Sequence, residues 1–241
     1  MTTTVPDAGG GVELPPLLRL YAERALPPDQ PVPRQVRITQ NGEMWQKPGA
    51  RALRFTATQF FAVERIGFSW QARFSLVGPL ALRVVDDYAD GDGGLEVRLL
   101  GLPLQRQRGP ETVAGEALRY LAELPFVPHA IAHNRELEWR GLGERTAEVA
   151  GRIAGERLTV ELEFDDAGDI VRSSSQSRRR KVGNEWLPTP WGGRFGDYKI
   201  LGDIRLPTSG EAYWDLPHGR HVYWRGTVLS AELLDEPFRR S

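Results

Sequence analysis

The chain has 241 residues, with 31 basic and 32 acidic side chains, a formal net charge of −1 and no cysteine. The balanced charge argues against a dedicated nucleic-acid-binding protein, because such proteins usually carry a clear basic excess. The lack of cysteine excludes disulfides, thiolate metal sites and cysteine nucleophiles, which fits a reducing compartment.

The N-terminal residues 1–12 are small, polar and rich in glycine, which predicts a flexible tail. They contain no basic segment followed by an apolar one, so they do not have the pattern of a signal peptide. No run of the chain approaches about 18 apolar residues, so we expect no membrane span and a cytoplasmic location. Residues 13–241 show no internal repeat and no linker, and we expect them to form one domain.

A short helix is predicted to begin at Pro15 and Pro16, because proline is tolerated in the first turn of a helix. Its apolar stripe comprises Leu17, Leu18, Tyr21 and Ala25. From Pro33 onward the hydrophobic period changes from 3.6 to 2, which indicates strands.

The clearest strand covers residues 68–76, where apolar side chains alternate with polar ones. Asn41-Gly42 is a turn or bulge signal and the segment 90–94 is a turn signal, since their residues tolerate positive φ. Sequential strands joined by short turns predict an antiparallel meander.

One longer helix interrupts the strands, beginning at Gly109-Pro110-Glu111 and ending before Pro125. We expect its buried stripe to comprise Val113, Ala117, Tyr120, Leu121 and Leu124. The same pattern places Glu116, Arg119 and Glu123 on the solvent face. A short second helix is expected over residues 128–134, and strands resume after it as far as residue 233.

These elements predict a mainly β (α+β) fold: one large curved antiparallel sheet, or half-barrel, of about ten strands. Two or three helices would cover its concave face, because sheets this wide curl and need one face covered. The helix of residues 110–124 is the expected cover.

Six short motifs extend along the chain in a fixed order. They are Gly42-Glu43-Met44, Phe68-x-Trp70-x-Ala72-Arg73-Phe74, Asp87-Tyr88-x-Asp90-Gly91, Gly115-Glu116-x-x-Arg119-Tyr120-Leu121-Ala122-Glu123, Pro190-Trp191 and Tyr223-Trp224-Arg225-Gly226. Together they resemble a bacterial family of unknown function over nearly the whole chain after Pro15. That resemblance implies no activity and no catalytic residue.

The expected architecture is also similar to that of the carriers that sort bacterial lipoproteins. Those carriers have a strongly curved antiparallel sheet, helices on its concave side and an apolar cavity between the two. They are exported, whereas this sequence shows no export signal. A likeness of fold is a weak argument for function.

The ligand-binding candidates are five residues with large or charged side chains on these motifs: Arg73, Tyr88, Tyr120, Trp191 and Trp224. Aromatic side chains suit either a packed core or a ligand cavity, so both interpretations stand for the seven tryptophans. Arg73 either holds an acidic head group or forms a structural ion pair with Glu43, Asp86 or Asp87.

Sites for metals, cofactors and nucleophilic catalysis find little support in the sequence, and we expect neither a metal nor a cofactor. His129 and His133 lack the glutamate of a zinc-binding HExxH helix. No serine has the Gly-x-Ser-x-Gly setting of a nucleophile elbow. Acid–base chemistry stays open, since Asp86, Asp87, Glu43 and Glu116 are candidate neighbours of Tyr88 and Tyr120 in a pocket.

Residues 178–181, Arg-Arg-Arg-Lys, are the only basic run. On a strand these charges alternate between the two faces and discourage edge pairing, which we favour over binding of phosphate or a lipid surface.

The leading functional hypothesis is therefore a soluble binding protein for a hydrophobic or lipid-like small molecule, held in the cavity of a curved sheet. Two alternatives stay open: a metal-independent enzyme that uses acid–base residues in the same pocket, and a self-associating interaction module. The sequence specifies neither the ligand nor the oligomeric state.

Overall fold

A computed structural model describes residues 14–76 and 80–240 of the chain. The predicted tail, residues 1–12, lies outside these residues. Within them, no helix is both long and apolar enough to cross a bilayer.

The first half of the chain forms an antiparallel meander of six strands, which confirms the prediction for this region. Its strands are β1 (Gln35–Met44), β2 (Leu53–Ala62), β3 (Gly67–Ser75), β4 (Ala81–Ala89), β5 (Asp92–Leu99) and β6 (Leu102–Gln107). Each strand pairs with the next along the chain, so β6 lies at one edge of the sheet.

The second half starts at the opposite edge and returns to the middle. Its strands are β7 (Glu138–Gly143), β8 (Thr146–Ile153), β9 (Glu156–Phe164), β10 (Ile170–Ser175), β13 (Trp191–Leu201), β14 (Ile204–Leu216) and β15 (Gly219–Leu234). The last strand pairs with β1 from Gln35 opposite Leu234 to Met44 opposite Trp224. This long-range pair joins the two halves into one thirteen-stranded antiparallel sheet that is not closed into a barrel.

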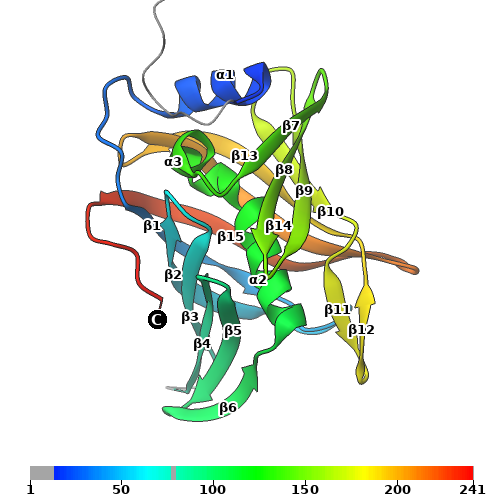
Figure 1. Cartoon of the computed structure of the whole chain (residues 1–241). Coiled ribbons are helices and arrows are strands. Elements are labelled where there is room, and N and C mark those ends of the chain that lie inside the picture. The colour runs from blue at the N-terminus through cyan, green and yellow to red at the C-terminus, as the bar shows by residue number, and fades with distance from the viewer. Residues whose placement is uncertain (1–13, 77–79, 241) are drawn as a thin grey trace, which may run out of the picture.

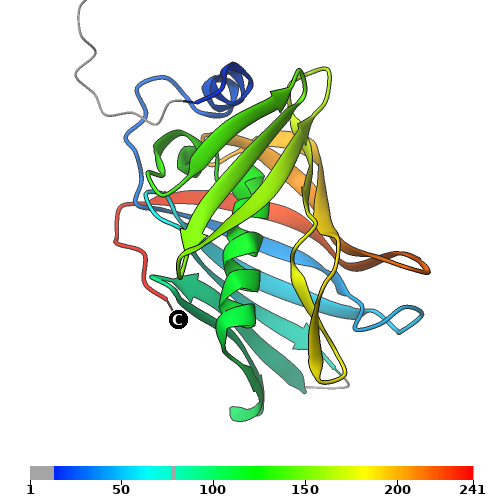
Figure 2. The same ribbon diagram turned by 45° about the vertical axis from the view of Figure 1, so that its right-hand side comes forward.

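A separate two-stranded hairpin, β11 (Arg179–Val182) and β12 (Glu185–Pro188), is inserted between β10 and β13. In both views it extends beside the central helix (Figures 1 and 2). The basic run therefore belongs to a small hairpin outside the main sheet.

The helices are α1 (Pro16–Ala25), α2 (Pro110–Ala122) and α3 (Pro128–His133), with a 3-10 turn, η1 (Leu124–Phe126), between the last two. The sheet curves around α2, which connects the β6 edge to the β7 edge (Figure 2). The helix packs against β8 and β9 on one side and against β4 and β5 on the other. The predicted curved sheet with a helix on its concave face is confirmed.

The alternation in β3 and β9 follows the sequence pattern. Phe68, Trp70, Ala72 and Phe74 are buried, whereas Gln71, Arg73 and Ser75 are exposed. Ser69 departs from the pattern, because it is also buried. The inward side chains of both halves meet those of α2 in one hydrophobic core.

The sheet has more strands than the ten expected, because local signals misplaced some boundaries. Strands β5 and β6, for example, are separated only by a tight turn in which Leu100 and Gly101 have φ of 50° and 85°. Conversely, β14 continues through Pro207 and Gly210, two residue types that usually interrupt a strand.

Candidate functional site

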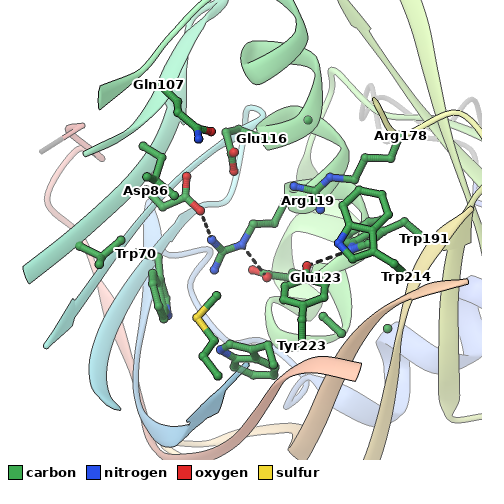
Figure 3. Close-up of a pocket in the computed structure, with 18 of the residues that line it drawn as sticks. Trp70, Asp86, Gln107, Glu116, Arg119, Glu123, Arg178, Trp191, Trp214 and Tyr223 are labelled. Atoms are coloured by element: carbon green, nitrogen blue, oxygen red, sulfur yellow. Dashed lines mark hydrogen bonds and ion pairs between the residues drawn. The ribbon is translucent and has the colours of Figure 1, made fainter. Parts of the chain in front are cut away.

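The concave side of the sheet contains a cavity of about 470 Å³. Residues from β1 to β6, from α2 and η1, and from β10 to β15 line it, so both halves of the sheet contribute. Its volume falls within the range of small-molecule binding sites in proteins, roughly 300–1,000 Å³. Figure 3 shows the labelled side chains that surround it.

The floor of the cavity is formed by small residues of two neighbouring strands. Gly193 on β13 and Gly210 and Ala212 on β14 all line it. Side chains alternate between the faces of a strand, so these positions point to the concave side together with Trp191 and Trp214. The cavity therefore exists because the small residues Gly193, Gly210 and Ala212 lie between large aromatic side chains.

Aromatic side chains form most of the apolar wall. Its members are Trp45, Trp70, Phe74, Phe126, Trp186, Trp191, Phe195, Trp214, Tyr223 and Trp224. Six of the seven tryptophans of the chain are among them, so tryptophan is concentrated at this cavity. The rings contact one another: Trp214 stacks on Tyr223 with 6.3 Å between ring centroids.

A β-bulge allows two consecutive residues of β15 to line the cavity. Ala212 pairs with Trp224, but the next residue, Tyr213, pairs with Val222, so Tyr223 is the extra residue. In a regular strand, neighbouring side chains point to opposite faces. Here both Tyr223 and Trp224 line the cavity, and Tyr223 Oη accepts a hydrogen bond from Trp191 Nε1 at 2.9 Å.

The polar wall comes from α2, and it corrects a sequence-based expectation. Glu116, Arg119 and Glu123 were expected to face solvent, but all three line the cavity. Glu116 is only 7% exposed. The reason is the curvature of the sheet, which covers the polar face of the helix as well as the apolar one.

Arg119 links the helix to the sheet. Its guanidinium donates hydrogen bonds to Asp86 on β4 and, at 2.8 Å, to Glu123 one helical turn further on. It also lies over the rings of Phe68 and Trp70, 4.9 and 5.1 Å from their centroids. Burial by itself lowers the pKa of Arg119, but the neighbouring carboxyl groups outweigh it and the pKa rises, so this side chain is a permanent cation.

A chain of hydrogen bonds continues from this ion pair along the sheet. Gln59 Nε2 donates to Glu123 Oε2 at 2.6 Å, and Gln40 Nε2 donates to Gln59 Oε1 at 3.2 Å. Gln40 Oε1 accepts from Trp70 Nε1 at 3.1 Å. The chain holds Glu123 and Trp70 in fixed orientations on one side of the cavity.

Two carboxyl groups meet at the other end of the polar wall. Glu116 on α2 and Asp86 on β4 each have one buried oxygen, Oε2 and Oδ1, without a hydrogen-bond partner among the described residues. Burial raises the pKa of Glu116 well above its usual value, and the neighbouring Asp86 raises it further. A carboxyl group whose pKa is raised in this way is suited to donating a proton inside the cavity.

The comparison with protein families identifies the chain. The model of a family of unknown function, DUF6544, matches residues 8–226. The chain belongs to this family. The predicted resemblance to a family of unknown function is thereby confirmed, and no curated protein matches this DUF6544 sequence.

Several solved structures resemble the DUF6544 chain at low identity. A LolA superfamily protein from Nitrosomonas europaea is 12% identical, with a TM-score of 0.47, over 92% of this chain and 93% of its own. A DUF1329 family protein from Desulfovibrio piger is 10% identical, with a TM-score of 0.40, over 90% of each chain. A β-barrel-like DUF1849 protein from Brucella abortus is 9% identical, with a TM-score of 0.28, over 83% of this chain and 98% of its own. These likenesses assign no ligand and no activity.

Two of the five residues predicted to bind ligand line the cavity of the DUF6544 chain. They are Trp191 and Trp224. Tyr120 is fully buried elsewhere in the core, where its hydroxyl donates to Ala62 O at 2.8 Å and accepts from Asn134 Nδ2. Tyr88 is also buried in the core and does not line the cavity. A ligand-binding role for each of these residues stays a prediction.

Arg73 lies on the outer face of β3, opposite the buried Trp70 face. The three carboxylates proposed as its ion-pair partners bind other arginines: Glu43 pairs with Arg54, Asp86 with Arg119 and Asp87 with Arg240. The expectation of that ion pair is therefore wrong. Strand β3 alternates strictly at this position, so an inward Trp70 sends Arg73 outward.

The basic run was also interpreted too simply. Arg178, Arg179 and Lys181 all line the cavity, because the run lies on the hairpin beside α2 and not on an edge strand of the main sheet. No local signal in the sequence indicates that this hairpin leaves the sheet.

Proposed function

We propose that this DUF6544 protein binds a hydrophobic or lipid-like small molecule in the cavity between α2 and the curved sheet. The observation that carries the proposal is the cavity itself, which has an aromatic wall that includes six of the seven tryptophans of the chain. A cytoplasmic location and a single-domain organisation stay predictions from the sequence.

The apolar surface of the cavity supports a ligand with a hydrocarbon part. Besides the aromatic wall it includes Met44, Leu53, Leu82, Val84, Leu95 and Val97. Burial of about 200 Å² of apolar ligand surface would contribute about 5 kcal/mol before the costs of association. A gain of about 5 kcal/mol corresponds to a dissociation constant of about 0.2 mM, so we expect binding no tighter than this from that apolar contact alone.

Mass spectrometry of the purified protein tests this function, first under native conditions and then after extraction with organic solvent. We expect a small apolar compound to leave the protein on denaturation. An Ala212→Phe variant, whose new side chain would occupy the cavity floor, serves as the comparison and should carry much less of that compound. Equal amounts in both proteins would place the compound outside the cavity and contradict the proposal.

The Asp86–Glu116 pair favours a second candidate function, a metal-independent enzyme that uses acid–base chemistry in the same cavity. Two carboxyl groups close together, one of them with a raised pKa, are the arrangement that many enzymes use for acid–base catalysis. Incubation of the extracted compound with the protein, followed by mass analysis, tests for turnover. A product that forms with the native protein but not with Glu116→Gln would support an enzyme.

A further inference from the structure

The basic end of the cavity, formed by residues 178–181 at the start of the β11–β12 hairpin, has no counter-charge. Among residues 14–76 and 80–240, none of these four side chains forms an ion pair. Arg178, Arg179 and Lys181 line the cavity, and Arg180 lies over Trp214 at 6.0 Å. A group of unpaired cations at the edge of an apolar cavity attracts anions.

Arg178 is the member of this group that is fixed in place. Its guanidinium lies 4.1 Å from the ring centroid of Trp191 and 5.7 Å from that of Trp214. Stacking on an aromatic face leaves the hydrogen-bond donors at the edge of a guanidinium unused. Its Nη1 is buried and has no partner among the described residues, which costs free energy unless a ligand supplies an acceptor.

A second unsatisfied group lies at the same cavity. Ser173 on β10 is fully buried, lines the cavity, and its Oγ has no partner within the described part of the chain. Residue 193, opposite Ser173 in the sheet, is a glycine, and a Cβ there would lie only 3.3 Å from that hydroxyl. The glycine therefore keeps the space beside the hydroxyl clear.

No carboxyl group among the described residues, Glu111 of the cavity lining included, forms an ion pair with Arg178. Glu116 is the acid of the polar wall whose pKa Arg178 lowers, but burial and the neighbouring Asp86 raise this pKa by more, and Glu116 forms no ion pair with Arg178. Glu211, another acid of the lining, is paired with Arg225 at 3.3 Å. Asp86 and Glu123 are paired with Arg119.

We propose that the bound molecule carries an oxyanion head group, a carboxylate or a phosphate, which Arg178 holds beside Trp191 while the hydrocarbon chain extends toward Trp70. The two ends are distinct in Figure 3, where Arg178 and Trp191 lie on one side of the cavity and Trp70 and Asp86 on the other. A planar guanidinium suits both head groups, because its paired donors match two oxygens of either. This inference rests on the proposed function and specifies its ligand class.

The test compares three probes with the same chain: dodecanoate and dodecyl phosphate, each titrated below its critical micelle concentration, and 1-dodecanol, titrated below its solubility limit. We expect both anions to bind about tenfold to a hundredfold more tightly than the alcohol, the range expected for charge-assisted hydrogen bonds. Tighter binding of dodecanoate would indicate a fatty-acid-like ligand. Tighter binding of dodecyl phosphate would indicate a ligand with a phosphate head group. Equal affinity for the alcohol and the anions would overturn the inference and leave the proposed function intact, whereas failure of all three to bind would overturn both.

Variants locate the anion site. Arg178→Gln should reduce the affinity for dodecanoate to that for dodecanol while leaving dodecanol binding unchanged. Arg73→Gln, on the outer face, is the matched control and should leave the preference intact. Lys181→Gln, at the edge of the cavity, should weaken anion binding by a few fold at low salt and less at high salt, and it provides a test that does not depend on the folding of the Arg178 variant. A preference for anions that survives Arg178→Gln would contradict the assignment.

Discussion

The guanidinium of Arg178 stacks on the indole of Trp191, 4.1 Å from its ring centroid, and so joins the β11–β12 hairpin to the sheet at the edge of the cavity. Trp191 in turn donates a hydrogen bond to Tyr223, so the hairpin, β13 and β15 contact one another through these three side chains. Any ligand at this end of the cavity would lie against the indole, and this contact leads to the first prediction.

Ligand binding should change the fluorescence of Trp191. We expect dodecanoate to alter the tryptophan emission of the native protein, because its carboxylate would bind to the guanidinium that stacks on this indole and so change the electrostatic surroundings of the ring. Trp191→Phe should lose much of this change while keeping a weakened affinity. Trp139→Phe is the control, since Trp139 does not line the cavity, and an equal loss of signal in both variants would contradict the placement.

Filling the cavity should abolish binding without unfolding the protein. Ala212 lies on the cavity floor, so Ala212→Phe places a ring in existing space and we expect a melting temperature close to the native one. Dodecanol affinity should fall by at least about tenfold. The control is Thr56→Phe, which adds the same side chain on the exposed face of β2 and should bind dodecanol normally. If Ala212→Phe also bound dodecanol normally, the ligand would lie outside this cavity.

The ion pairs of Arg119 should be important for stability, because they are largely buried. Arg119→Met leaves the carboxylates of Asp86 and Glu123 without their cation, and we expect the free energy of unfolding to fall by about 3–5 kcal/mol in urea denaturation. Arg152→Met removes an exposed partner of Glu138 and should change stability little. Similar losses in both variants would contradict a special role for the buried site.

Glu116 should make the stability depend on pH in a defined direction. Its pKa is raised in the folded state, so between the ordinary carboxyl pKa and the raised one the folded protein holds a proton that the unfolded chain has released. Stability from this group is therefore complete at low pH and is lost as the pH rises through the folded pKa. Glu116→Gln cannot lose the proton and should become more stable relative to the native protein as pH rises, by at most about 1.4 kcal/mol per pH unit.

Asp87 must be separated from this effect. Burial raises the pKa of Asp87 to about 6, so it contributes in the same direction. Asp87 is present in both proteins, so its contribution cancels when they are compared. The difference in stability between the native protein and Glu116→Gln therefore measures the contribution of Glu116. A difference that stays constant from pH 5 to pH 8 in denaturant titrations would show that Glu116 has an ordinary pKa.

Gly42 illustrates where local sequence signals fail. Asn41-Gly42 has the composition of a turn or bulge, yet both residues lie inside the continuous strand β1, two residues beyond the irregularity in its pairing with β15. A Cβ at Gly42 would lie 2.0 Å from the carbonyl oxygen of Arg225, so glycine is required for the close approach of these strands. We expect Gly42→Ala to cost at least about 2 kcal/mol, and Gly141→Ala, where the space is open, to cost little in the same denaturation experiment.

The fold class followed from the sequence because alternation is a local property. The pattern from Phe68 to Phe74 fixes which face of β3 is buried, and the stripe of Tyr120 and Leu121 identifies α2. The pairing of β1 with β15, in contrast, joins segments almost 200 residues apart, and no local signal indicates it.

Only part of the candidate site could be predicted from the sequence, again because local patterns do not show how distant segments pack together. Trp191 and Trp224 were found because large aromatic side chains suggest a cavity, but the face of α2 that carries Glu116 and Arg119 has the spacing of a solvent-exposed face. Its burial results from the curvature of the whole sheet. The only available signal for the polar wall was that Glu116, Arg119 and Glu123 belong to one of the six motifs. Their helical spacing assigned them to the solvent face instead.

A crystal structure of the protein with dodecanoate tests the central claim most directly. We expect the carboxylate at the Arg178 guanidinium beside Trp191, and the hydrocarbon chain extending from there along α2 toward Trp70. Dodecanoate bound at saturating concentration only outside this cavity would contradict the account.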